Sequence, residues 1–303
     1  MRPAASVLAA AALLAGGVVL APPAWQAATL LLEQDSPAAI AAFRLRQQSP
    51  ADITRAIEQA LNDNDPELAA SLVEVAVDIH APLPAPLIKR VGDAQGFNAG
   101  RMASDIWQGF TSGDTSSEAA LGGALAADVT GVGDIRDLVR EGGSYLDDGT
   151  YDPVVLTLAS AGLALTVATF ATAGAAAPAR TGVTILKAAK KADRIPAPLV
   201  AEFVTISRNA LDRGALDETV TLAKRLDVSG AATASRRILR PAVLETVTRT
   251  ADDVAQLATT SGYRAVNQSL QLAESTADIS RLHRLASATG PKFRGTLALL
   301  GAS

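Results

Sequence analysis

The sequence predicts an all-α protein, and three observations lead to this prediction. Apolar residues make up 49% of the 303 residues but aromatic residues only 4%, so the apolar character comes mainly from Ala, Leu and Val. Ala and Leu lose little free energy on entering a helix, whereas aromatic side chains favour strands. In addition, Ser-Pro and Asp-Pro pairs recur where helices would begin, and apolar residues follow them at helical spacing.

The first 27 residues are predicted to be a signal peptide or a signal anchor. Arg2 is followed by an uninterrupted apolar run that extends to residue 21, which is typical of both kinds of segment. Pro22 would follow the best cleavage point, and Trp25 suits the depth of lipid headgroups. Retention as an anchor is therefore favoured over cleavage.

Residues 28–117 are predicted to form an acidic helical region that ends in a linker rich in Pro and Gly. In this region Ser or Asp precedes Pro three times, which places a side-chain acceptor at the N-cap and Pro in the first turn. The expected helices are 37–48, 50–61 and 66–79, and the last two form an antiparallel hairpin.

The central segment, residues 118–194, contains a long uncharged run. Between Asp152 and Arg180 there are 27 consecutive uncharged positions, more than the roughly 20 that a transmembrane helix needs. Small residues allow helices to pack closely in a membrane, and the packing residues expected here are Ser160, Gly162, Thr166 and Gly174. The same small residues weaken insertion, so a soluble helical hairpin that bends near Gly174 remains the alternative.

Charge is distributed unevenly on the two sides of this run. Residues 1–178 have a balance of −11 and residues 179–303 a balance of +7, which together give the net charge of −4. Cytoplasmic segments next to membrane spans are enriched in Lys and Arg. The N-terminus is therefore predicted on the inner side of the cell membrane. Residues 28–152 are predicted on the outer side, and the C-terminal half on the inner side.

The basic residues that follow the run are predicted to contact the membrane surface. These residues are Arg180, Lys187, Lys190 and Lys191. Lysines gathered on one side of an amphipathic helix attract anionic lipids. A solvated helix face is the alternative interpretation.

Three carboxylates are candidates for acid–base or metal chemistry, but a structural role is favoured. Asp134 and Asp137 are three residues apart and share a helix face, and Asp128 precedes them. Asp134 stands at the start of an apolar helix, where an acid complements the helix dipole. His80 and His283 have no evident acidic partner in the sequence, and the chain has no cysteine. No cofactor and no metal are expected.

A resemblance to known proteins rests on three consecutive segments. They are the run DVTGVGDIRDLVREGG, the apolar segment after it and the run GVTILKAAKKA. Over about residues 120–194 the chain resembles a segment of uncharacterised bacterial membrane-anchored proteins. More faintly, it is similar to the helical segment that precedes the toxin domains of polymorphic bacterial toxins. The resemblance implies a place in the bacterial inner membrane and implies no catalytic residues.

Residues 195–303 are predicted to form a basic helical bundle with helices near 198–212, 215–227, 241–260 and 263–288. A capping box that starts at Ser275 can divide the last of these and open a new helix. Its arginines have few aromatic residues beside them, so nucleic acid is not an expected partner. The function expected from the sequence is a membrane-anchored, non-catalytic envelope protein that acts as a scaffold, assembly or interaction protein. Its expected partners are the lipid bilayer and another membrane helix or protein. The alternatives are a toxin-like, membrane-active or effector-related protein and an enzyme that uses Asp128, Asp134 and Asp137.

Overall fold

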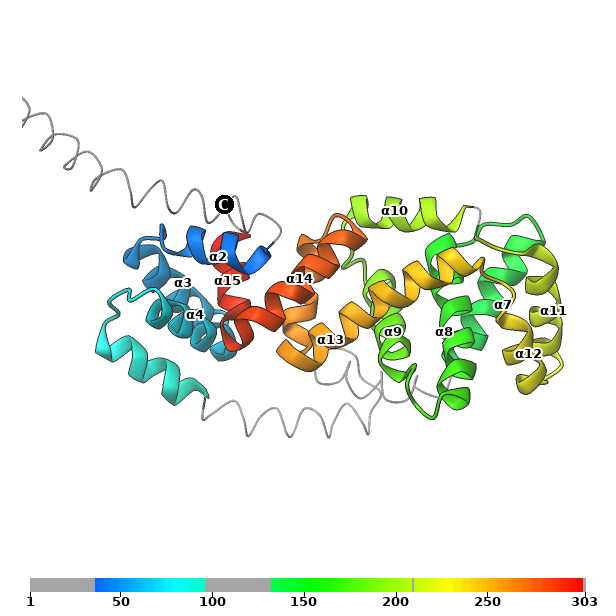
Figure 1. The fold of residues 1–303 in the computed structure, drawn as a ribbon, viewed down its shortest axis with the longest axis horizontal. Helices are drawn as coiled ribbons and strands as arrows, with labels where there is room; N and C mark the ends of the chain where they lie inside the picture. The colour runs from blue at the N-terminus through cyan, green and yellow to red at the C-terminus, as the bar shows by residue number, and fades with distance from the viewer. Residues whose placement is uncertain (1–35, 96–131, 209, 302–303) are drawn as a thin grey trace, which may run out of the picture.

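The computed structural model describes residues 36–95, 132–208 and 210–301, and this part of the chain is built from helices (Figure 1). Within these ranges the only β-type pairing is an isolated bridge between Leu211 and Leu239. The all-α prediction is confirmed. The predicted signal anchor, residues 1–27, and Asp128 lie outside the described residues.

The N-terminal helices begin where the Ser-Pro and Asp-Pro pairs predict. Ser36, Ser49 and Asp65 each accept a hydrogen bond from a backbone N–H in the first turn of the helix that follows. A further helix covers residues 85–95. Together these helices enclose an apolar core around the fully buried Ile57 and Leu72. The three capped helices are α2 (Pro37–Leu45), α3 (Pro50–Asn62) and α4 (Pro66–Asp78).

The uncharged central run folds as one arm and the turn of a helical hairpin. Helix α8 (Pro153–Ala171) and helix α9 (Ala177–Lys191) pack side by side (Figure 1). The turn between them contains Gly174 at φ +99°, a backbone conformation that favours glycine. The run therefore turns back on itself near Gly174, as a helical hairpin does.

Helix α8 is the one helix in the described ranges that is long and apolar enough to cross a bilayer. In this structure 67% of its most apolar window is buried inside the protein. A core helix and a membrane span share these properties, so the burial shows only that α8 has protein neighbours. Those neighbours are α9, α7 (Val132–Leu146), α10 (Ala197–Ser207), α12 (Val228–Ser235) and α13 (Pro241–Leu272).

Helix α13 runs across the middle of the molecule and joins its two ends (Figure 1). Gly262, at φ +81° and ψ 168°, divides it into two arms. The first arm crosses α9 at Gly182, where an added Cβ would lie 1.7 Å from the carbonyl oxygen of Ala251. Only a glycine permits this close crossing. Helix α11 (Arg213–Lys224) packs with α12 and α7 at one end.

The C-terminal helices return to the N-terminal ones. After α14 (Thr276–Thr289) and a short 3₁₀ turn, α15 (Phe293–Leu300) packs against α4 and α2. Arg294 forms an ion pair with Asp65 at 2.6 Å, and Ser71 Oγ accepts a hydrogen bond from the Gly295 N–H at 2.8 Å. The acidic and basic regions of the chain are therefore in direct contact.

This contact corrects the predicted topology. Residues 28–152 were expected outside the membrane and the C-terminal half inside. Atoms joined by an ion pair of 2.6 Å cannot lie on opposite sides of a hydrocarbon layer of about 30 Å. In the folded molecule the two regions lie on the same side of any membrane.

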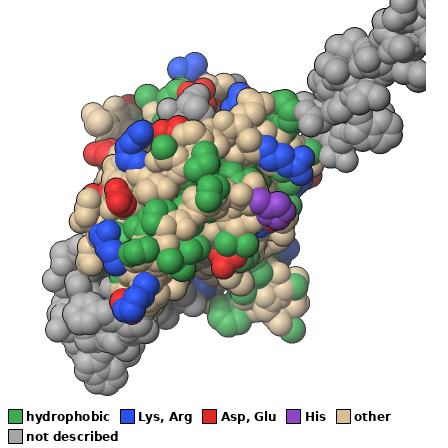
Figure 2. Space-filling model, turned by 90° about the vertical axis from the view of Figure 1, so that its left-hand side faces the viewer, with side chains coloured by type: hydrophobic (Ala, Val, Ile, Leu, Met, Phe, Trp, Pro, Cys, Tyr) green, Lys and Arg blue, Asp and Glu red, His purple; other side chains and the backbone are tan. Residues whose placement is uncertain are grey.

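The end of the molecule formed by α2, α3 and α4 is shown in Figure 2. On this face, hydrophobic side chains are interspersed with both basic and acidic ones. Neither sign of charge dominates the visible surface. The face therefore lacks the continuous basic surface that recognition of nucleic-acid phosphates requires.

Candidate functional site

The candidate site begins with an acidic face on α7. Asp134, Asp137 and Glu141 follow one another at spacings of three and four residues, which places them on one side of a helix. All three are buried. Buried carboxylates need charged or hydrogen-bonding partners because transfer from water is costly.

The partners come from α9, where Lys187 and Lys191 are four residues apart. Lys187 Nζ lies 2.5 Å from Asp134 Oδ1 and 3.1 Å from Asp137 Oδ2. Lys191 Nζ lies 2.6 Å from Asp137 Oδ2. Two carboxylates and two ammonium groups therefore balance in charge. We call these four residues the α7–α9 charge cluster.

Gly162 on α8 makes room for this cluster. A Cβ added at Gly162 would lie 2.5 Å from Asp134 Oδ2, closer than any stable contact. The absence of a side chain therefore lets the Asp134 carboxylate rest against α8 while it pairs with Lys187. Gly162, a small residue of the apolar run, therefore makes room for an ion pair within the chain.

The electrostatics of Asp137 follow from its two lysines. Burial alone would raise the pKa of Asp137, but the hydrogen bond from Lys191 and the charge of Lys187 outweigh it. The pKa of Asp137 is therefore below its ordinary value. This carboxylate stays ionised at neutral pH and is unsuited to donate a proton there.

A second arrangement lies one turn farther along α7. Glu141 accepts a hydrogen bond from the Asp152 N–H at 2.8 Å, and Lys190 Nζ lies 2.7 Å from Asp152 Oδ2. Asp152 also caps α8 by accepting hydrogen bonds from the N–H groups of Val154 and Val155. Burial raises the pKa of Asp152, but Lys190 and the Val155 N–H outweigh this effect and lower it.

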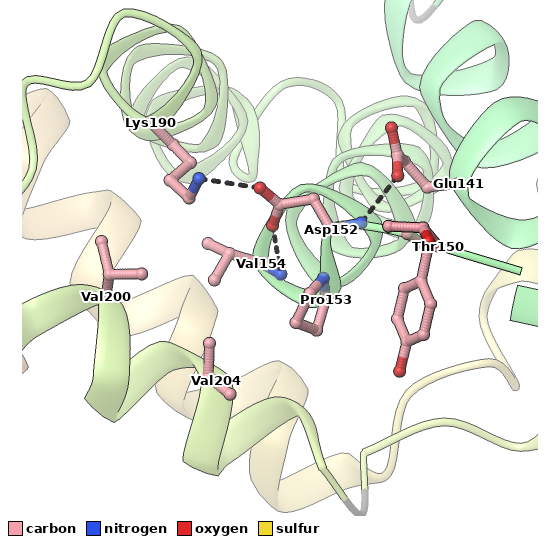
Figure 3. Close-up of a pocket in the computed structure, with 9 residues that line it drawn as sticks. Glu141, Thr150, Asp152, Pro153, Val154, Lys190, Val200 and Val204 are labelled. Atoms are coloured by element: carbon pink, nitrogen blue, oxygen red, sulfur yellow. Dashed lines mark hydrogen bonds and ion pairs between the residues drawn. The ribbon is translucent and has the colours of Figure 1, made fainter. Parts of the chain in front are cut away.

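These groups border an open cavity of about 380 Å³ (Figure 3). Figure 3 shows Glu141, Asp152 and Lys190 on one side of it and Val200 and Val204 of α10 on the other. Both carboxylates at its wall are paired: Asp152 with Lys190, and Glu141 with Arg140, whose Nη2 lies 2.6 Å from Glu141 Oε1. The cavity has the size of a small ligand site, but its carboxylates have cations without a ligand.

The site has no set of groups arranged for catalysis. A catalytic site needs a nucleophile or acid–base group with access to substrate and an orienting partner. Asp134 and Asp137 are buried and paired with lysines. In the described residues no group of three or more His, Cys, Asp or Glu side chains could hold a metal ion.

Of the four predicted membrane-contact residues, the three lysines lie against carboxylates of the same chain. Lys187 is only 2% exposed, and Lys190 and Lys191 pair with Asp152 and Asp137. The prediction that the lysines share one side of a helix agrees with their positions, but that side faces carboxylates of the same chain. Lys187 is therefore not a membrane-surface residue in this structure.

Arg180 differs from the three lysines. Its Nε donates a hydrogen bond to Thr166 Oγ1 at 2.8 Å. Its Nη2 is buried and has no hydrogen-bond partner among the described residues. Within those residues it also forms no ion pair with a carboxylate.

The predicted packing residues of the central run have four different places in the structure. Ser160 is fully buried and its hydroxyl donates a hydrogen bond to the carbonyl oxygen of Leu156. Gly162 leaves room for Asp134, and Thr166 Oγ1 accepts a hydrogen bond from Arg180. Gly174 lies in the exposed turn, where an added Cβ would meet no atom within 4 Å. Its role is the positive φ of the turn.

Sequence reasoning missed the carboxylate beside His283. His283 Nδ1 lies 2.9 Å from Asp253 Oδ1, and Ser280 Oγ donates a short hydrogen bond to the other oxygen of Asp253. The two residues are 30 positions apart and lie on different helices, so no local signal connects them. Asp253 stands between Ser280 and His283, whereas in a catalytic triad the His bridges the Ser and the Asp.

Comparison with known proteins gives no family for this chain. No protein-family profile, curated protein or solved structure matches it.

Proposed function

We propose that this protein is a membrane-anchored, non-catalytic protein of the bacterial cell envelope that acts as a scaffold, assembly or interaction protein. The observation that carries the proposal is the pairing of its buried charges. The α7–α9 charge cluster joins helices and leaves neither carboxylate available as an acid or base. Buried charges used in this way favour a structural role over a chemical one.

The membrane anchor in this proposal is the apolar run of residues 3–21. It is long enough to cross a bilayer and follows a single basic residue. We place the N-terminus on the cytoplasmic side of the inner membrane and the helical body on its outer side. The ion pair between Asp65 and Arg294 supports one compartment for both the acidic and the basic regions.

Topology reporters test this arrangement. We expect reporters fused near Gly113 and near Gly230 to report the same, outer compartment, and the protein to fractionate with membranes. Reporters in opposite compartments would instead support a span by residues 153–171. Recovery in the soluble fraction would contradict the anchor.

A variant of the apolar run provides the matched control. Ala11→Arg together with Leu14→Arg places two charges near the middle of the apolar run, residues 3–21. Each arginine costs about 2.5 to 3.5 kcal/mol at the centre of a membrane helix. The variant should leave the membrane fraction, while the double substitution Arg44→Ala and Arg55→Ala on the exposed side of α2 and α3 should not.

One observation favours a second candidate, a toxin-like, membrane-active protein. Helix α8 is apolar enough to enter a bilayer and its end is exposed, with Phe170 at 84%. This candidate predicts growth inhibition on expression, lost when charges are placed within residues 153–171. Normal growth at high expression would exclude it.

The enzyme candidate has less support. Asp134 and Asp137 are paired with lysines, so Asp134→Asn or Asp137→Asn should destabilise the protein rather than remove an activity from a stable one. A stable Asn variant that loses its phenotype would restore this candidate.

A further inference from the structure

The tip of the α8–α9 hairpin is an uncharged, exposed surface, which we define as residues 170–178. Phe170 is 84% exposed, and nearly all the residues after it up to Pro178 are exposed. We propose that this hairpin tip dips into the interfacial layer of an anionic bilayer. The proposal builds on the membrane anchor proposed above, because the anchor brings the helical body to the membrane.

The composition of the tip suits lipid better than water. The tip is made of Ala, Thr, Gly, Pro and Phe, and no charged residue occurs between Asp152 and Arg180. Exposed turns of proteins in water are usually polar. A turn with an exposed phenylalanine and no charge is typical of a surface that contacts an apolar phase or a partner.

Several polar groups at the tip have hydrogen-bond partners within the hairpin. Thr169 and Thr172 donate their hydroxyls to carbonyl oxygens one turn earlier, at 2.7 Å each. The Gly174 N–H donates to the Thr169 carbonyl oxygen at 2.8 Å. Backbone and side-chain polar groups that have internal partners lower the cost of leaving water. The tip is therefore preorganised to enter the interface.

Arg180 supplies the matching positive charge at the base of the tip. It is 9% exposed, its Nε binds Thr166, and its Nη2 has no partner among the described residues. A guanidinium with unused N–H donors is suited to bind a phosphate group. The lysines farther along α9 are paired with Asp134, Asp137 and Asp152, so within the described residues Arg180 is the cation of α9 that forms no ion pair.

The position of Arg180 agrees with the depth of interfacial contacts. It lies three residues after Ala177, the first residue of α9, or about 5 Å along the helix at 1.5 Å per residue. Apolar faces of interfacial helices are buried about 5 to 10 Å below the headgroup level. A tip inserted to this depth would bring Arg180 to the level of the lipid phosphates.

Single-cysteine labelling of the full chain tests the proposal, because the protein has no cysteine of its own. Ala175→Cys places an environment-sensitive fluorophore on the tip. Leu226→Cys is the matched control, since Leu226 is 85% exposed and lies in the turn between α11 and α12. Each labelled protein is reconstituted into phosphatidylcholine vesicles with and without phosphatidylglycerol, and into vesicles that carry a nitroxide near the headgroup.

We expect the label at position 175 to shift to the blue and to be quenched by the nitroxide lipid, most strongly with phosphatidylglycerol. The label at position 226 should show neither effect. Arg180→Gln should remove the dependence on phosphatidylglycerol, and Phe170→Asp should reduce the quenching at position 175. Circular dichroism checks that both variants are folded.

Three results would overturn the proposal. A label at position 175 that stays in water, on protein that floats with the vesicles, would leave the anchor intact and exclude tip insertion. A blue shift without nitroxide quenching would show that the tip is covered by this chain or by a second copy. Failure of the protein to float with vesicles would contradict the anchor itself and, with it, this proposal.

Discussion

At the residue scale, Lys187 is the lysine of the α7–α9 charge cluster that pairs with both carboxylates. Its ammonium group is the nearest cation to Asp134 and lies 3.1 Å from Asp137. Lys187→Met keeps most of the side-chain volume and removes the charge. We expect this substitution to lower the free energy of unfolding by about 3 to 5 kcal/mol, because a buried carboxylate is left without its cation. Urea unfolding followed by circular dichroism measures the loss.

An exposed ion pair on α3 provides the control for this prediction. Arg55 Nη1 lies 2.9 Å from Asp52 Oδ1, and both side chains are largely exposed. Arg55→Met should therefore leave the free energy of unfolding nearly unchanged, because exposed ion pairs are screened by solvent. Equal effects of Lys187→Met and Arg55→Met would contradict a structural role for the buried cluster.

Single residues were only partly predictable from the sequence. Asp134 does lie in the first turn of α7, as its position before an apolar helix indicated. Its partner Lys187 is 53 residues away, and no spacing rule relates residues at that separation. The same limit applies to Asp253 and His283, which meet only because α13 and α14 pack together.

At the scale of elements, the approach of α7 to α8 depends on Gly162. An alanine there gains helix propensity, worth up to about 1 kcal/mol, but its Cβ would lie 2.5 Å from a carboxylate oxygen of Asp134. That carboxylate is held by Lys187, so it cannot move without loss of the pair. We expect Gly162→Ala to destabilise the protein by about 1 to 3 kcal/mol, as overpacking does.

Gly143→Ala on α7 is the matched control for this steric argument. An added Cβ at Gly143 meets no atom within 4 Å. The substitution should leave stability unchanged or raise it by about 0.4 to 1 kcal/mol, because alanine restricts the unfolded chain. Thermal unfolding of both variants compares them, and a stabilising Gly162→Ala would show that α7 can shift away at no cost.

Elements with local signals were predicted well, and those without such signals were not. The starts of α2, α3, α4 and α14 follow N-cap side chains that the sequence displays. Helix α12 has only eight residues, so it lacks enough turns for a periodic apolar pattern to appear. The turn after α8 was expected near Gly174 only as an alternative to one continuous span, because an uncharged run is compatible with both.

At the scale of the whole molecule, the acidic and basic regions of the chain form ion pairs with each other. The −11 of residues 1–178 and the +7 of residues 179–303 suggested two compartments. In the structure they face each other: Asp65 binds Arg294, and Asp78 binds Lys292. Charge asymmetry along a sequence predicts that two regions differ, but it does not say whether a membrane separates them or attraction joins them.

Because of these ion pairs, the free energy of unfolding is expected to fall at acid pH. The pKa values of Asp65, Asp137 and Asp152 are all below the ordinary value. For each of them burial raises the pKa, and the hydrogen bond and charge of a neighbouring Arg or Lys outweigh it. A carboxylate with a lowered native pKa binds fewer protons in the folded state than in the unfolded state. Its contribution to stability is therefore complete above the unfolded pKa of about 3.9 and is lost as pH falls through the native value.

We expect the midpoint of thermal unfolding to be nearly constant from pH 7 to pH 5 and to fall steeply below about pH 4. Circular dichroism of the full chain in mild detergent, recorded across this range, measures the midpoint. Asp65→Asn should lower stability at pH 7 and flatten the acid dependence, because this side chain then no longer titrates and the ion pairs of Asp65 with Arg264 and Arg294 are removed. Asp63 provides the control, since it neighbours Asp65 at the same turn and forms no ion pair with a described residue. Asp63→Asn should leave the acid dependence unchanged, and a midpoint that stays constant down to pH 3 in the unaltered protein would mean that these ion pairs do not hold the two regions together.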